Sequence, residues 1–238
     1  MSTLVSCLSP AYRLPVLAGN AVLHGREIKD AEMFSRILFH VGTVIDKQVF
    51  GTLPNYSDAE IVEMEQPLKW ISVNPDIFTF LVSSDMGGVV GYLTAMPLAD
   101  TFYQKIKDGF VLDNEVSERD IIPFRNGETV RIYLMSIAID ERYRTCGEGL
   151  FESPYVQLIN AFLEKMTFYF KDRQVKVTHM LATAWTPQGL RGCRSMGMRS
   201  VGKDRFCNPV YEIEIDSIDP NNKRIMPTLR KLASLYRG

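Results

Sequence analysis

Apolar residues recur along this chain with two different periods, and each period predicts a different kind of element. Between Asp30 and Phe50 the apolar positions return every three or four residues, which predicts one helix. The stretch Val210–Ile215 alternates strictly between apolar and polar residues, which predicts a strand with one exposed face. Two β-rich runs, Ile77–Ser83 and Val89–Met96, flank a short segment that ends in two glycines. This arrangement is typical of a β-hairpin.

Capping signals predict further helices. Ser57 opens a capping-box pattern with Glu60, so we expect a second helix from there to about Trp70. Thr186 is placed as an N-cap before Pro187, and Gly197 is a stop signal for the same helix. The other expected elements are a short helix over Thr101–Lys107, a strand over Val175–Ala184 and a final helix from Pro227.

The central stretch from Ile132 to Gly149 combines a strand with a glycine turn. Ile132–Ile139 is an apolar run of the length of a buried strand, and a polar turn with Gly147 and Gly149 follows it. A helical period begins after Gly149, in Phe151, Tyr155, Leu158, Phe162, Met166 and Tyr169. A strand, glycine turn and helix leave main-chain N–H groups free at the positive end of a helix dipole, where a phosphate binds well.

The turn carries the motif R-x-x-G-x-G. Its residues are Arg144, Thr145, Cys146, Gly147, Glu148 and Gly149. A Walker loop would need Gly-Lys-Ser/Thr where Leu150 and Phe151 stand, and a dinucleotide fingerprint would need a third glycine where Glu152 stands. The motif resembles the pyrophosphate loop of the GNAT superfamily, the acyl-CoA-dependent N-acyltransferases. A glycine turn without a ligand is the alternative reading of so short a motif.

The order of the elements is also similar to that of a GNAT domain. The resemblance implies an α/β fold with a mixed, mostly antiparallel central sheet, flanking helices and splayed fourth and fifth strands. It covers residues 1–215 as a single domain, with the best match over 77–215, and residues 216–238 form a C-terminal extension that ends in a helix.

The resemblance implies acetyl-CoA as the acyl donor and no metal. The main chain of Ile137, Ala138 and Ile139 would pair with the pantetheine arm. The N–H groups from Arg144 to Gly149 would hold the pyrophosphate, with Arg142 or Arg144 able to add positive charge. In the family motif N-x-x-A-x-x-x-Y-x-x-x-G-F, Thr186 stands at the Asn position and belongs with the expected cofactor-binding residues. Cys193 stands at the Tyr position of that motif.

The catalytic expectations are Tyr133 and Cys193. Tyr133 occupies the position at which some family members keep a carboxylate base, and Cys193 replaces the usual tyrosine proton donor. A tyrosine with a pKa near ~10 is a poor base at neutral pH, so water relayed to Glu128 or another carboxylate is an alternative. Tyr211 is an alternative donor, Cys193 is also readable as a buried structural cysteine, and catalysis by positioning alone stays open.

Pro154 conflicts with a regular helix that starts at the glycine turn, because proline removes a hydrogen bond and crowds the preceding turn. Either the first turn is bent, or the helix restarts with Ser153 as N-cap and Pro154 at its first position. The second arrangement moves the helix dipole away from the loop.

The composition narrows the function classes. The 238 residues are 46% hydrophobic and 23% charged with a net charge of −1, so neither a nucleic-acid nor a membrane partner is indicated. The four cysteines form no C-x-x-C pair, which argues against a zinc site, and the first residues lack a positive region followed by an apolar core. We therefore expect a cytoplasmic protein without a metal. The resulting hypothesis is an N-acetyltransferase acting on a primary amine of a small molecule or peptide. A non-catalytic CoA-binding sensor or scaffold is the alternative, and the oligomeric state stays open.

Overall fold

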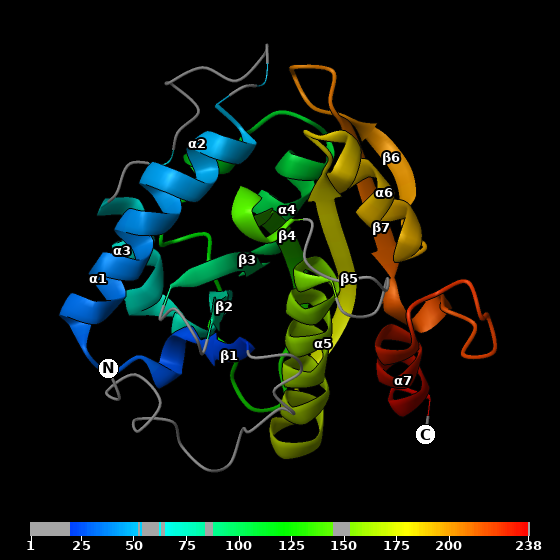
Figure 1. Ribbon diagram of the computed structural model, residues 1–238. Coiled ribbons are helices and arrows are strands. Elements are labelled where there is room, and N and C mark those ends of the chain that lie inside the picture. The colour runs from blue at the N-terminus through cyan, green and yellow to red at the C-terminus, as the bar shows by residue number, and fades with distance from the viewer. Residues whose placement is uncertain are drawn as a thin grey trace. The chain divides into compact units, whose positions relative to one another are not determined.

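The structure is a computed structural model, and it divides into two compact units (Figure 1). The first unit comprises Met1–Thr94 with Ser136–Ala161, and the second comprises Ala95–Met135 with Phe162–Gly238. The residues that the structure describes are 20–51, 53, 62, 65–83, 88–144 and 153–237. The start of the helix predicted at Ser57 and the predicted loop residues Thr145–Gly149 therefore lie outside the described residues.

Seven strands form one mixed sheet in the order β1-β2-β3-β4-β5-β7-β6. The strands are β1 (Asn20–His24), β2 (Phe78–Ser83), β3 (Val89–Leu98), β4 (Thr129–Ile139), β5 (Lys176–Thr183), β6 (Arg199–Lys203) and β7 (Pro209–Glu214). β4 and β5 are parallel, whereas β1–β2, β2–β3, β5–β7 and β6–β7 are antiparallel. This is the mixed, mostly antiparallel α/β sheet that the GNAT resemblance predicts. The predicted hairpin is confirmed as β2 and β3, whereas β6 was not predicted.

Most predicted helices are present with shifted ends. The α-helices are α1 (Ala31–His40), α2 (Asp46–Val49), α3 (Glu65–Val73), α4 (Asp100–Lys107), α5 (Pro154–Arg173), α6 (Pro187–Ser195) and α7 (Pro227–Leu235). The helix expected over Asp30–Phe50 consists of α1 and α2 joined by a π-helical turn, Val41–Ile45. Asp30 caps it by accepting hydrogen bonds from the N–H groups of Glu32 and Met33. The helix expected from Pro227 is α7.

In the first unit, aromatic side chains pack α1 on the sheet. Phe34 of α1 lies edge-on to both Phe78 and Phe80 of β2, with ring centroids 6.2 and 5.8 Å away. Trp70 of α3 is buried as well. Pro67 falls in the first turn of α3, where its missing N–H has no partner to lose. The apolar face predicted for α1 is thus the face that binds the sheet.

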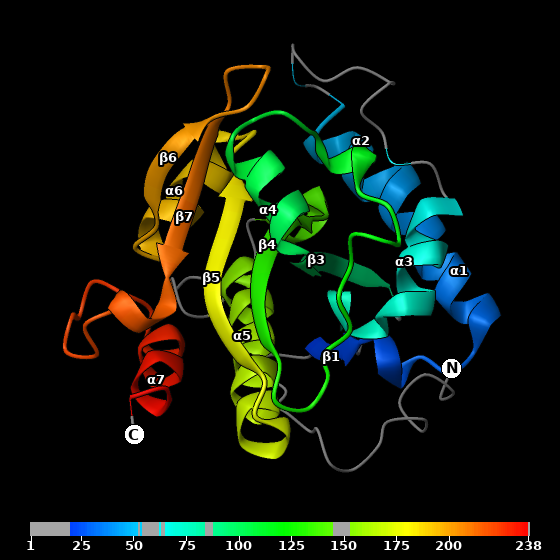
Figure 2. The ribbon, with the colours of Figure 1, turned by 180° about the vertical axis from the view of Figure 1, so that it is seen from behind.

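In the second unit, β5, β7 and β6 lie side by side, with α6 between β5 and β6 in the chain (Figure 2). The predicted cap of α6 is confirmed, because Thr186 Oγ1 accepts a hydrogen bond of 2.9 Å from the N–H of Gly189. Gly197 ends the helix region with a φ of 79°, a left-handed conformation that glycine adopts without strain. Tyr236, after α7, packs on Phe170 of α5 with ring centroids 4.6 Å apart.

Gly91 lets β3 approach the end of β4 closely. A Cβ at Gly91 would lie 2.7 Å from the carbonyl oxygen of Ala138 and 2.6 Å from Ile139 Cδ1. A bulge lies next to it, because Leu81 pairs with Gly91 while Val82 pairs with Val89. Any other residue at this position forces β4 away from β3.

We therefore expect Gly91→Ala to destabilise the protein by about 1–3 kcal/mol through overpacking. Gly88→Ala is the matched control, because a Cβ at Gly88 meets nothing within 4 Å. Urea denaturation measures both. Equal stability of the two variants would contradict the close approach of β3 and β4.

Candidate functional site

The pairing of β4 with β5 ends well before β4 itself does. The parallel register runs from Thr129 opposite Lys176 to Tyr133 opposite Leu181. β4 continues to Ile139, and Met135, Ser136 and Ile137 are half-buried, unlike the fully buried Ile132–Leu134 before them. Beyond Tyr133, no β5 residue in the described part of the chain pairs with that edge of β4. Main-chain groups on such an edge are available to an extended ligand.

Asp140 fixes the end of β4. Its side chain is fully buried, and its N–H donates a hydrogen bond of 2.9 Å to the carbonyl of Val90 on β3. Its carboxylate accepts from Arg142 Nη2 at 2.7 Å, from Arg142 Nε at 3.0 Å and from the Arg142 N–H at 2.9 Å. Hydrogen bonds from Arg142 hold the pKa of Asp140 below its usual range. Arg142 is therefore committed to holding this turn together.

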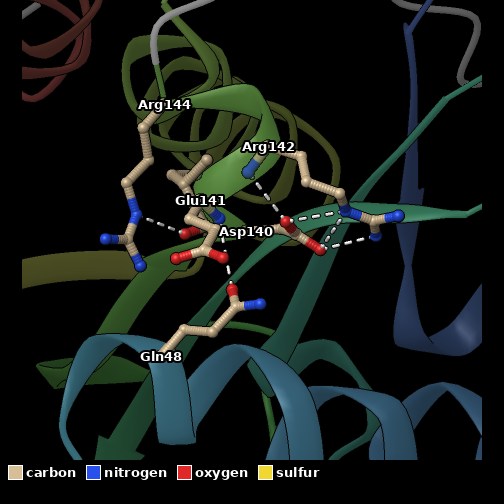
Figure 3. Close-up of polar contacts among 6 residues, drawn as sticks. Gln48, Asp140, Glu141, Arg142 and Arg144 are labelled. Atoms are coloured by element: carbon tan, nitrogen blue, oxygen red, sulfur yellow. Dashed lines mark hydrogen bonds and ion pairs between the residues drawn. The ribbon is translucent and has the colours of Figure 1, made fainter. Parts of the chain in front are cut away.

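Arg144 points to the other side of the same turn (Figure 3). Its Nε donates a hydrogen bond of 3.0 Å to the carbonyl of Ile139, and the residue is exposed. Gln48 of α2 steadies the turn, because its Oε1 accepts a 3.2 Å hydrogen bond from the Glu141 N–H. The guanidinium group of Arg144 is thereby held beside the end of β4. The carbonyl of Ile139, one of the predicted pantetheine contacts, is engaged by Arg144.

The helix that the sequence predicts after Gly149 begins at Pro154. α5 starts at Pro154, and Ser153 caps it, because Ser153 Oγ accepts a hydrogen bond of 3.4 Å from the N–H of Val156. This is the second of the two arrangements that the sequence allows for Pro154. It places the first residue of α5 five positions after Gly149. Thr145, Cys146, Gly147, Glu148 and Gly149 lie outside the described residues, so their role stays a prediction.

Tyr133 lies in a closed environment, and its expected catalytic role stays a prediction. It is completely buried, and its hydroxyl donates a hydrogen bond to Asp113 Oδ1. Thr183 Oγ1 lies 3.4 Å from the same hydroxyl. Burial and the neighbouring Asp113 raise the pKa of Tyr133 well above its usual value. Tyr133 therefore stays protonated, and the nearest carboxylate is Asp113 rather than Glu128.

Asp113 is an ionisable group that the sequence analysis missed. Burial raises its pKa to about 7, the charge of Asp204 adds to this rise, and the hydrogen bond from Tyr133 opposes it. A carboxyl group with a pKa near neutrality suits proton transfer at physiological pH. Asp113 lies 20 positions before Tyr133 in an irregular segment, and no motif marks it.

A second acid–tyrosine pair lies in the first unit. The hydroxyl of Tyr92 on β3 donates a hydrogen bond to Asp46 Oδ1 at the start of α2. Burial raises the pKa of Asp46 to about 7, against the lowering effect of this bond. Asp46 follows the π-helical turn directly, and such turns are frequent at functional sites.

Cys193 and Thr186 have structural roles in α6. Cys193 is buried and free, and burial raises the pKa of its thiol to about 11. The Thr186 hydroxyl caps α6. Their catalytic and cofactor-binding assignments stay predictions, and for both residues the structure favours the simpler structural reading.

The residues that the structure describes contain no group of three or more His, Cys, Asp or Glu side chains arranged to hold a metal ion. None of the helices in this part of the chain has the length and apolar character needed to cross a membrane.

Asp46 and Asp113 give the stability of the protein a defined pH dependence. Each carboxyl has a pKa of 3.8 when unperturbed and about 7 in the fold, so between these values the folded chain binds more protons than the unfolded chain. Stability therefore falls as the pH rises through this window, by up to about 1.4 kcal/mol per pH unit for each group. Urea denaturation of wild type, Asp113→Asn and Asp46→Asn at about pH 4 and at about pH 7 measures this pH dependence of the free energy of unfolding. A variant with the wild-type pH dependence would contradict the raised pKa at its site.

Comparisons with known proteins bear on the fold. No protein-family model and no curated protein matches the sequence. Among solved structures, the loading GNATL domain of CurA from Lyngbya majuscula is similar, with a TM-score of 0.54 and 13% identity over 84% of this chain and 99% of that chain.

Two further solved structures are similar at TM-scores too low to carry an argument. Ard1 from Thermoplasma volcanium has a TM-score of 0.47 and 14% identity over 82% of this chain and 95% of that chain. An N-acetyltransferase from Staphylococcus aureus Mu50 has a TM-score of 0.46 and 12% identity over 82% of this chain and 98% of that chain. The sheet order, the parallel β4–β5 pair and the match to the CurA domain together identify the fold of this chain as that of the GNAT superfamily.

Proposed function

We propose that this protein is an acyl-CoA-dependent N-acyltransferase that transfers an acetyl group from acetyl-CoA to a primary amine. The observation that carries the proposal is the arrangement of β4. The strand stops pairing with β5 at Tyr133, continues to Ile139, and ends beside a guanidinium group that Ile139 itself holds in place.

The residues proposed to bind acetyl-CoA fall into two groups, one for its pyrophosphate and one for its pantetheine arm. Arg144 and the main-chain N–H groups from Thr145 to Gly149 would bind the pyrophosphate, because a guanidinium and free amides suit phosphate oxygens. The main chain of Ile137 and Ala138 would pair with the amides of the pantetheine arm, as an added strand pairs with a sheet edge. The side chain of Ala138 is buried, so only its main chain takes part.

Transfer requires a neutral amine next to the thioester and a group that accepts its proton. The thiolate of CoA is a tolerable leaving group, so a strong acid is not required to expel it. The Cys193 thiol is a weak acid, because burial raises its pKa to about 11 and keeps it protonated near neutral pH. A reaction that needs no strong acid is compatible with such a thiol. Positioning and one proton acceptor are therefore sufficient for the reaction.

A non-catalytic CoA-binding domain is the second candidate. It is favoured by the residues that stand at the Asn and Tyr markers of the family motif. The Thr186 hydroxyl caps α6, and Cys193 is buried within the same helix. Such a protein would bind acetyl-CoA without releasing free thiol.

Two measurements on the purified protein separate these functions. Calorimetric titration with acetyl-CoA is expected to show saturable binding at one site. Incubation of the complex with a panel of primary amines is expected to release free CoA thiol with at least one of them. Binding without thiol release would establish the sensor instead, and the lack of any binding would exclude both functions.

The two arginines of the β4 turn are expected to respond differently to removal. Arg144→Ala should weaken acetyl-CoA binding by about 10-fold, because a charge-assisted contact to phosphate is lost. Arg36→Ala is the control, since the ion pair of Arg36 within the described residues is with exposed Glu32 on α1. Calorimetry measures the affinities, and equal affinities of these two variants would contradict the role of Arg144.

Arg142→Ala should instead lower the free energy of unfolding, because it leaves the buried carboxylate of Asp140 without its guanidinium. Arg142 holds the pKa of Asp140 below its unfolded value, so this stabilisation is present at neutral pH and is lost as the pH falls through the carboxyl range. Urea denaturation at pH 7 and at about pH 3 tests this. A deficit of equal size at both pH values would contradict the assignment.

A further inference from the structure

The helical turn that follows β4 is capped by a residue from a distant part of the chain. The turn comprises Glu141–Tyr143, with Asp140 as its N-cap. The first N–H groups of a helix have no partner inside the helix. Here the Asp140 carboxylate accepts from the Arg142 N–H at 2.9 Å, and Gln48 Oε1 accepts from the Glu141 N–H at 3.2 Å (Figure 3). Gln48 lies 93 positions before Glu141 and completes the cap.

The other end of this helical turn presents Arg144. The Arg144 N–H donates a hydrogen bond of 3.3 Å to the carbonyl of Glu141, and Arg144 Nε donates to the carbonyl of Ile139 at 3.0 Å. The turn therefore holds both the main chain and the guanidinium group of Arg144. Because Glu141 bonds to Gln48 through its N–H and to Arg144 through its carbonyl, it links the two residues directly.

Three hydrogen bonds join α2, β3 and this turn into a closed ring. Each bond joins a different pair of the three elements, and all of the bonded residues belong to the first unit. The bonds run from the Tyr92 hydroxyl to Asp46, from the Asp140 N–H to the Val90 carbonyl and from the Glu141 N–H to Gln48. The position of the turn therefore depends on α2 as well as on β3.

The short helix that carries Gln48 is set at its angle by an irregular turn. The π-helical turn Val41–Ile45 ends immediately before α2, and the Asp46 N–H donates to the carbonyl of Val41. Successive residues of an α-helix differ by about 100°, so the extra residue of the wider turn rotates α2 by about that angle relative to a regular continuation of α1. Gln48 reaches the Glu141 N–H from this rotated position. Such turns are frequent at functional sites.

We propose that Gln48 is a positioning residue for the acyl donor, which holds the Glu141–Tyr143 turn and thereby Arg144 in the place from which the pyrophosphate is bound. This inference rests on the proposed acyltransferase function and extends its donor site to α2. Gln48 acts through the turn rather than by contact with the donor. A turn that is already in place avoids the cost of ordering it on binding, so the loss of its cap weakens the affinity.

Gln48→Met tests this role, because methionine keeps the length of the side chain and removes the amide oxygen. Acetyl-CoA binding, measured by calorimetry, should weaken by about 5-fold, the size of one neutral hydrogen bond. In amine acetylation the KM for acetyl-CoA should rise while kcat stays unchanged, since positioning of the donor site affects binding and not the chemical step. Exchange of the Glu141 amide hydrogen in the free protein should become faster.

Gln104→Met is the matched control. The same replacement there removes an exposed hydrogen bond within α4, from Gln104 Nε2 to Asp108 Oδ1. Its acetyl-CoA affinity and its Glu141 exchange should equal those of wild type, and thermal unfolding checks that each variant is folded. An effect of equal size in both variants would reflect a general loss of stability and contradict the role of Gln48.

Combination with Arg144→Ala separates action through the turn from an independent contact. If Gln48 acts through Arg144, the double variant should bind acetyl-CoA about 10-fold more weakly than wild type, as Arg144→Ala does alone, whereas independent contributions would multiply to about 50-fold. Wild-type affinity of Gln48→Met, unchanged exchange at Glu141 or an about 50-fold loss in the double variant would overturn this inference and leave the acyltransferase function standing. The lack of acetyl-CoA binding by wild type would instead remove the proposed function, and this inference with it.

Discussion

The structure depends on one constraint: β4 extends beyond the end of its pairing with the parallel strand β5. A strand in a sheet interior has its main-chain donors and acceptors used on both edges, and a strand that loses one neighbour must satisfy that edge in another way. β4 pairs with β5 only as far as Tyr133 and then runs on to Ile139. The half-buried stretch from Met135 to Ile137 follows from that separation. Such an edge is open to pairing with an extended ligand.

Other features of the first unit keep the end of β4 in place. Gly91 allows β3 to lie close against Ala138 and Ile139, and the Asp140 N–H bonds to the carbonyl of Val90. Asp140 is buried and anchored by Arg142, whereas Arg144 donates a hydrogen bond to the carbonyl of Ile139. The two guanidinium groups therefore have different contacts. That of Arg142 neutralises the buried carboxylate of Asp140, while that of Arg144 is held by a carbonyl and faces solvent. A loop that binds phosphate needs such a fixed starting point, because ordering it on binding would cost affinity.

The sequence predicted elements whose signals are local. The β2–β3 hairpin, the Thr186 cap and the Gly197 stop each depend on a few neighbouring residues, and each is present. β6 was missed because it is an edge strand with mostly exposed residues, so no apolar alternation marks it. Asp113 and Asp46 were missed for a different reason. Their raised pKa values come from burial among residues distant in sequence, such as Tyr133 and Asp204 for Asp113 and Tyr92 for Asp46. Pro154 allowed two helix starts, and the hydrogen bond from the Val156 N–H to Ser153 Oγ selects between them.

Amide hydrogen exchange of β4 with and without acetyl-CoA tests the central claim most directly, because it reports on the main chain itself. Val130 and Ile132 already lie in the segment paired with β5, so the ligand should change their exchange little. If the donor lies along the free edge, exchange at Ile137 and Ala138 slows when acetyl-CoA is added. Unchanged exchange at these two residues in a protein that binds acetyl-CoA would place the ligand elsewhere and contradict the account.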